Sequence, residues 1–182
     1  TATTDRLTEI GRRNILNVRE LGVTSLEFTP NPVVRRKIMR IALERVGDIE
    51  WAEHCAIFGL PLRIAQNFGI GVVLFGENPQ REYSAGRDGA QNAIILDKQW
   101  REEYGGLLGM RPSYLVGKDG ITAEDMWDYQ WPEETAVPVF GVFLGQFFPW
   151  DGYKNALMAQ ANGFETWPTA VPGNGVNYES LD

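Results

Sequence analysis

The chain is poor in the two side chains that build most thiol and imidazole sites. Its 182 residues include one cysteine and one histidine. The single cysteine, Cys55, excludes a disulfide within the chain and a cysteine zinc cluster, and the single histidine, His54, excludes cages of several imidazoles. This usage is typical of a reducing compartment, so we expect a cytoplasmic protein. We interpret His54 as a helix-surface or core residue and Cys55 as a small buried hydrophobe rather than a nucleophile.

Positive charge is also scarce, because the formal net charge is −7 at neutral pH. An acidic chain offers no broad basic surface for neutralising phosphates, so we expect no general nucleic-acid-binding role. Basic residues nevertheless gather early in the sequence, at Arg12, Arg13, Arg35, Arg36, Lys37 and Arg40. We interpret them as two solvated helix faces, with contact to a small anionic substrate as the alternative.

Long apolar runs and the common phosphate motifs are missing as well. No apolar stretch approaches the length of a membrane span, so we expect none. Gly117-Lys118 is followed by Asp119, so there is no Walker A loop. The GxG sequences at residues 69–71 and 173–175 lack the third glycine of a dinucleotide fingerprint.

Apolar periodicity and breakers predict alternating helices and strands. Helices are predicted over 7–21, 32–47, 51–58, 61–68, 96–104, 122–127 and 153–162. Strands are predicted over 24–29, 71–75 and 137–144, and the tail after Trp167 is expected to be irregular. This order predicts a single α/β domain over residues 1–182 with a parallel sheet.

Two of the predicted strands run directly into loops that can carry a site, the first densely polar and the second charged and aromatic. The first loop, GENPQREY at residues 76–83, carries Glu77, Asn78, Glu82 and Tyr83, and the second ends in Trp150-Asp151. Ligands in open α/β sheets bind just beyond the carboxyl ends of the strands. Carboxylates there can hold Mg²⁺, bind sugar hydroxyls or act as general bases, and an indole can stack on a sugar or a base. The alternatives are a plain solvated connection for the first loop and a core-edge aromatic for the indole.

Taken together, the chain resembles the N-acetyl sugar amidotransferases of the PP-loop ATP pyrophosphatase superfamily, which act in lipopolysaccharide and surface-sugar biosynthesis. The most specific segment is GENPQREY at residues 76–83. The other segments are IGRRN at 10–14, PNPVVRRK at 30–37, FLGQFFPWD at 143–151 and NYESLD at 177–182. These segments are collinear and span most of the chain.

The resemblance implies both a fold and a reaction. The fold would be a Rossmann-like parallel sheet with flanking helices, of the adenine nucleotide alpha hydrolase type. ATP with Mg²⁺ would adenylate the oxygen of an acetamido group on a nucleotide- or lipid-linked N-acetyl sugar and release pyrophosphate. Ammonia from a separate glutaminase subunit would then displace AMP and leave an acetamidino group. Water must be kept out, because the activated amide would otherwise hydrolyse.

The resemblance also assigns roles to individual residues. Glu77, Asn78 and Glu82 would face the cleft between ATP and the acceptor, together with Asp151 as the fourth catalytic residue. Gly76 would lie against the nucleotide. The sugar or its carrier phosphate would be bound by Arg13, Asn14, Tyr83 and Trp150.

The chain departs from the family in two respects. The SGGxDS phosphate loop that defines the superfamily is not in this sequence, and neither are the family's cysteine motifs. We therefore expect an internal part of the catalytic domain, with an incomplete sheet, weak ATP binding and little catalysis by itself. Two alternatives stay open: a non-catalytic subunit that binds a sugar or a partner, and another PP-loop ligase such as a tRNA-modifying enzyme.

Overall fold

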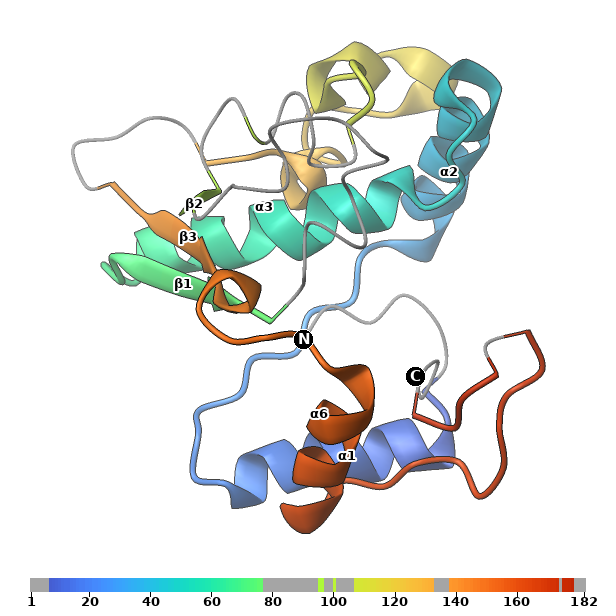
Figure 1. Cartoon of the computed structure of the whole chain (residues 1–182). Helices are drawn as coiled ribbons and strands as arrows, with labels where there is room; N and C mark the ends of the chain where they lie inside the picture. Colours follow the sequence, from blue (N-terminus) through green and yellow to red (C-terminus); the bar gives the residue numbers. More distant parts are fainter. Residues whose placement is uncertain are drawn as a thin grey trace. The chain divides into compact units, whose positions relative to one another are not determined.

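A computed structural model describes residues 7–76, 95–96, 100, 107–132, 138–173 and 175–178. The chain divides into two compact units (Figure 1). The first unit combines residues 1–29 with residues 150–182, and the second unit contains residues 30–149. The expectation of one domain over residues 1–182 stays a prediction, because a domain can contain more than one compact unit.

The first unit contains two helices and an extended tail (Figure 1). Helix α1 spans Glu9–Glu20 and begins at the N-cap Thr8, whose hydroxyl accepts a hydrogen bond from the Gly11 N–H at 3.0 Å. Helix α6 spans Gly152–Ala161, and the chain leaves it through Gly163 with φ at +87°. A Cβ added at Gly163 would lie 2.7 Å from the Asn17 side-chain oxygen, so the turn requires glycine for both conformation and space.

The second unit is built around two helices. Helix α2 spans Pro32–Val46, with Asn31 as N-cap and Gly47 at φ +74° as C-cap. Helix α3 spans Trp51–Asn67 and continues through Pro61. Between them lies the helix cluster of buried side chains, comprising Val34, Ile38, Ile41, Ala42, Trp51, Ala52, Cys55, Ala56, Leu107, Met110, Leu115, Ile121, Met126 and Tyr129.

A small sheet completes the second unit. Its strands are β1 (Val72–Phe75), β2 (Ile95–Leu96) and β3 (Phe140–Phe143), in the order β1-β3-β2. Strands β1 and β3 are parallel, whereas β2 is antiparallel to β3. The sheet cluster lies against α3 and contains Phe58, Leu62, Phe75, Leu96, Trp100 and Phe143. At Gly141 an added Cβ would lie 2.9 Å from the Leu96 Cβ, so this strand position has no room for a side chain.

The short elements of the second unit are 3-10 helices: η2 (Pro112–Leu115), η3 (Lys118–Gly120), η4 (Trp127–Tyr129) and η5 (Leu144–Gln146). Before η4, the Thr122 hydroxyl accepts from the Asp125 N–H at 3.1 Å, and the Asp125 carboxylate accepts from the Thr122 N–H at 2.9 Å. This reciprocal pair is a capping box, although it leads into a 3-10 turn instead of the α-helix predicted over 122–127.

The described residues confirm an α/β arrangement of helices with a small sheet that contains a parallel pair. Several local predictions are wrong. Residues 24–29 form no strand beyond a single bridge at Phe28, and Leu96 lies in β2 instead of starting a helix. The predicted break before Pro61 is absent, because α3 is one helix. The Rossmann-like arrangement stays a prediction.

Candidate functional site

The parallel strand pair brings two chain exits to one edge of the sheet. Phe75 and Phe143 are register partners at the carboxyl ends of β1 and β3. Gly76 follows Phe75 directly, so the predicted nucleotide-contacting glycine lies at this edge. Glu77, Asn78, Glu82 and Tyr83 lie outside the described residues. The edge is therefore the part of the predicted site that the second unit provides.

The exit from β3 is apolar. The chain passes through η5 and reaches Phe147 and Phe148, whose side chains are 59% and 66% exposed. Exposed phenylalanines beside a sheet edge are unusual for a solvated turn, because apolar side chains are normally removed from water. They can shield a reacting group from water if a ligand covers them.

Asp151 begins α6 in the first unit. Its carboxylate accepts a hydrogen bond from the Lys154 N–H at 3.1 Å and lies 3.0 Å from the Lys154 ammonium. The hydrogen bonds from the Lys154 backbone and side chain lower the pKa of Asp151, with a smaller electrostatic contribution from the same ammonium. Asp151 is thus an N-cap that stays ionised, which suits a fixed negative charge better than a general base. The neighbouring Trp150 is 37% exposed.

Arg13 and Asn14 are brought together on one residue of the tail. The Arg13 guanidinium donates to both carboxylate oxygens of Glu165, at 2.6 and 2.8 Å. Asn14 donates to the Glu165 carbonyl at 3.0 Å and accepts from the Glu165 N–H at 2.8 Å. The Arg13 hydrogen bond lowers the pKa of Glu165, and the same bond raises the pKa of Arg13. Any anion that binds Arg13 would therefore compete with Glu165.

Glu165 was missed by the sequence reasoning. The only signal in the sequence is that this carboxylate follows shortly after Gly163, the glycine through which the chain leaves α6. Of the predicted site residues that the structure describes, Arg13, Asn14, Trp150 and Asp151 belong to the first unit, and Gly76 belongs to the second.

The lone thiol and imidazole have structural environments. Cys55 is fully buried in the helix cluster, and burial raises the pKa of its thiol well above the ordinary value. The thiolate that a nucleophile needs is therefore disfavoured, which agrees with Cys55 being a small buried hydrophobe. On α3, the His54 Nδ1 lies 3.2 Å from an Asp48 carboxylate oxygen in a half-buried pair.

The part of the chain that the structure describes contains neither a metal-binding cluster nor a membrane-spanning helix. Within those residues, no group of three or more His, Cys, Asp or Glu side chains could hold a metal ion. None of the helices in the same residues is long and apolar enough to cross a membrane. The carboxylates predicted to accompany Mg²⁺, Glu77 and Glu82, lie outside the described residues.

Asp128 is a perturbed carboxyl that the sequence reasoning did not single out. Partial burial of this η4 residue raises its pKa, while the nearby Arg63 guanidinium acts in the opposite direction. Arg63 itself donates to the Trp127 carbonyl at 2.6 Å and lies over the Trp127 ring at 4.1 Å from its centroid. Protonated Asp128 is therefore favoured by folding. This stabilisation is complete below the pKa of the unfolded chain and is lost as pH rises through the folded pKa.

Asp128→Asn is consequently expected to stabilise the protein at neutral pH, because the neutral amide avoids the desolvation of a carboxylate. The gain should shrink as pH falls below the ordinary carboxyl range of about 4. Urea unfolding of both proteins, followed by circular dichroism at neutral pH and near pH 3, measures the difference in stability. A variant less stable than wild type at neutral pH would contradict the prediction.

Comparison with known proteins adds no family assignment. No family model matches the sequence, and no curated protein matches it at a significant level.

Proposed function

We propose that this chain contributes to an ATP-dependent amidotransferase that converts the acetamido group of an N-acetyl sugar into an acetamidino group. The observation that carries the proposal is the parallel, in-register pairing of β1 and β3. The family-like loop at residues 76–83 leaves the first of these strands, and the family-like segment at residues 143–151 leaves the second. A shared carboxyl edge is where ligands bind in open α/β sheets.

The reaction balances in two steps. The acetamido oxygen attacks the α-phosphorus of ATP, the bond to the β-phosphate oxygen breaks, and pyrophosphate leaves while the amide nitrogen loses its proton. Ammonia then attacks the acetyl carbon, and the carbon–oxygen bond breaks. AMP leaves with the former acetyl oxygen, and the sugar keeps an acetamidino group in its place.

The chain's residues have separate tasks in this proposal. Glu77, Asn78 and Glu82 face ATP and the acceptor, with the two carboxylates available to Mg²⁺, and Gly76 permits close approach of the nucleotide. Tyr83 and Trp150 contact the sugar. Phe147 and Phe148 keep water from the activated amide, a role supported by their exposure at the β3 exit.

The family resemblance also implies a fold, a partner subunit and an acceptor for the proposed reaction. The fold would be Rossmann-like, of the adenine nucleotide alpha hydrolase type. A glutaminase subunit would supply ammonia, and the acceptor would be a nucleotide- or lipid-linked N-acetyl sugar in the cytoplasm. Arg13 and Asn14 would contact the sugar or its carrier phosphate. Arg13 would first have to release Glu165, with which it forms an ion pair at 2.6 Å.

An isotope experiment tests the reaction. The protein expressed from its complete gene is supplied with ATP, Mg²⁺, ammonium and a panel of UDP-linked N-acetylhexosamines labelled with ¹⁸O in the acetyl group. We expect pyrophosphate, AMP that carries one ¹⁸O, and a sugar in which NH has replaced the acetyl oxygen. AMP without label would indicate that water had hydrolysed ATP directly. Absence of AMP with every acceptor would contradict the proposal.

Asp151→Asn separates the proposed role of this carboxylate from its structural one. Asparagine caps a helix about as well as aspartate, so the fold should be retained. Removal of the fixed charge is expected to lower kcat by about 10²- to 10³-fold, by analogy with the loss of one electrostatic contact in other active sites. The control is Glu20→Gln at the end of α1, which removes an exposed carboxylate without effect on turnover. Unchanged turnover in Asp151→Asn would remove Asp151 from the site.

A further inference from the structure

Residues 107–121, here called the strap, are fixed firmly to the helices of the second unit. Leu107, Leu115 and Ile121 of the strap are buried in the helix cluster. The Trp51 indole N–H donates to the Leu107 carbonyl at 2.9 Å, and Arg40 of α2 pairs with Asp119. The strap is therefore a preformed surface and not a loose loop.

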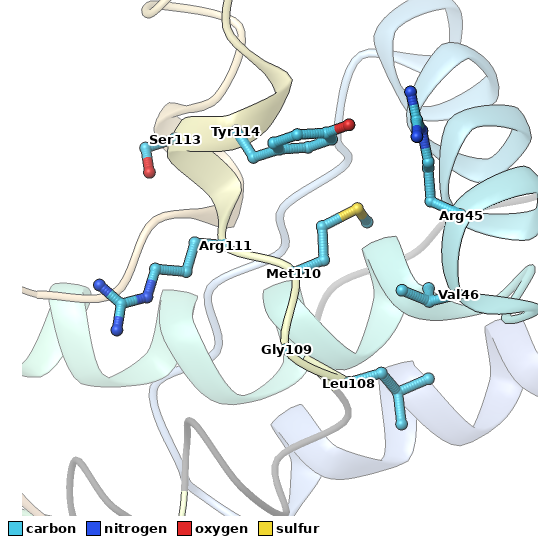
Figure 2. Close-up of a pocket in the computed structure, with 8 residues that line it drawn as sticks. All are labelled: Arg45, Val46, Leu108, Gly109, Met110, Arg111, Ser113 and Tyr114. Carbon is cyan, nitrogen blue, oxygen red and sulfur yellow. The ribbon is translucent and has the colours of Figure 1, made fainter.

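A pocket of about 460 Å³ lies between the strap and the carboxyl end of α2 (Figure 2). Its lining residues are Arg45, Val46, Leu108, Gly109, Met110, Arg111, Ser113 and Tyr114. The volume lies in the range of small-molecule sites. The lining comes from α2 and the strap, without a contribution from β1 or β3, so the pocket is distinct from the sheet edge described above.

The described lining combines apolar and cationic side chains without a carboxylate. Met110, Leu108 and Val46 supply apolar surface. The Arg45 and Tyr114 side chains face each other across the pocket, and the Arg111 side chain extends from the opposite side of Met110 (Figure 2). The Arg45 guanidinium lies 5.9 Å from the Tyr114 ring centroid, and the Lys118 ammonium lies 4.1 Å from it.

Arg45 and Arg111 give the pocket lining a positive character in a chain whose net charge is −7, and the Lys118 ammonium lies nearby over the Tyr114 ring. Arginine, lysine and a tyrosine hydroxyl are suitable donors for phosphate oxygens. The adjacent thioether and aliphatic side chains suit the apolar or planar remainder of the same ligand.

The pocket wall also contains an uncommon backbone conformation. Leu108 has φ at +48°, one of two non-glycine residues with positive φ among those that the structure describes, and Gly109 follows it at +79°. A leucine rarely adopts this conformation unless the surrounding structure enforces it, and such residues concentrate at ligand-binding sites. Here the enforcing contact is the anchored Leu107, whose carbonyl also accepts from the Met110 N–H at 2.8 Å.

We propose that the pocket between α2 and the strap binds a small phosphate ester. Its phosphate contacts Arg45 and the Tyr114 hydroxyl, and its apolar or planar part lies on Met110 and Leu108. This binding does not depend on the proposed reaction, because it requires neither ATP hydrolysis nor an acceptor sugar.

Methionine methyl NMR tests the proposal at a defined position. The chain has four methionines, of which Met110 lines the pocket, Met126 is buried in the helix cluster and Met158 is exposed on α6. UDP is the probe, with uridine and inorganic pyrophosphate as its two halves, in buffer free of ATP. We expect the Met110 methyl signal to shift with added UDP until the site is saturated. The Met158 methyl signal should not shift. UDP should bind at least tenfold more tightly than either half.

Substitutions then identify the phosphate contact. Arg45→Gln is expected to weaken UDP binding at least tenfold and to leave uridine binding unchanged, and Tyr114→Phe should weaken UDP binding by a smaller factor. Arg36→Gln is the matched control, because Arg36 is an exposed arginine of α2 outside the pocket lining. A thermal melt of each variant shows that the helix end is intact, since Arg45 also interacts favourably with the α2 terminus.

Three outcomes would overturn the proposal. They are the absence of a Met110 shift at millimolar UDP, equal binding of UDP and uridine, and equal weakening by Arg36→Gln and Arg45→Gln. None of these results bears on ¹⁸O transfer to AMP, so failure of this proposal is distinguishable from failure of the proposed reaction.

Discussion

Phe143→Ala is expected to lower the free energy of unfolding of the second unit by about 3–5 kcal/mol, the range for removing a large aromatic side chain from a core. Phe143 is 0% exposed, and its ring centroid lies 4.8 Å from that of Trp100, 5.8 Å from that of Phe75 and 6.3 Å from that of Phe58. Alanine would leave these three rings facing an empty volume. Because Phe75 is also the last residue of β1, the substitution should loosen the edge from which both proposed active-site segments leave.

Urea unfolding followed by far-ultraviolet circular dichroism measures the effect. Phe148→Ala is the matched control, because Phe148 belongs to the same segment but is 66% exposed. Surface substitutions of this kind usually change stability by less than about 0.5 kcal/mol. Equal urea midpoints for the two variants would contradict the aromatic packing around β3.

Local signals in the sequence were sufficient for much of the helix pattern. Helix α2 runs from the Asn31 cap to Gly47 because both ends are encoded by single residues. The Asn31 side chain accepts from the Val33 N–H at 2.9 Å, and Gly47 adopts φ +74°. The strand 71–75 was likewise evident as a short apolar run before Gly76, and it corresponds to β1. Such features depend on neighbours in sequence, so they can be predicted without knowledge of the tertiary structure.

Predictions failed where distant parts of the chain decide the structure. A proline in a helix interior removes one hydrogen bond and costs about 3 kcal/mol, which made Pro61 a predicted helix start. In the folded chain its neighbours Leu60 and Leu62 are both buried, and packing on either side offsets the proline. Residues 24–29 show the converse: the composition of a strand is present, but Leu26 is exposed and only Phe28 forms a bridge.

The candidate site was predictable in part for the same reason. That two loops leave the same sheet edge followed from the strand pattern, because parallel strands place their carboxyl ends together. The contact between Arg13 and Glu165 joins residues 152 positions apart, and no local pattern announces it. Nor could the pocket beside Tyr114 be foreseen, since its lining brings Arg45 of α2 against Met110 and Tyr114 of the strap, which are distant in the sequence.

Trp51→Ala is expected to be as damaging as Phe143→Ala, at about 3–5 kcal/mol, but for a different combination of reasons. Trp51 is 0% exposed at the start of α3, and its indole N–H donates to the Leu107 carbonyl at 2.9 Å in a buried hydrogen bond. Alanine removes the side-chain volume and also leaves that carbonyl without its indole donor. Trp51→Phe keeps most of the volume, and the Leu107 carbonyl keeps the Met110 N–H as a donor, so an expected loss of about 0.5–1.5 kcal/mol isolates the indole hydrogen bond.

The same pair of variants connects stability to the strap. Because Leu107 begins the strap, loss of the indole donor should reduce hydrogen-exchange protection at the Met110 amide, which donates to the Leu107 carbonyl at 2.8 Å. The Phe28 amide, in the first unit, is the reference position and should be unaffected. If Trp51→Phe matched wild type in both urea midpoint and Met110 protection, the indole would not anchor the strap. If only the midpoint fell, packing alone would account for the effect. A fall in both would show that one buried indole holds together the α3 start and the wall of the phosphate-binding pocket.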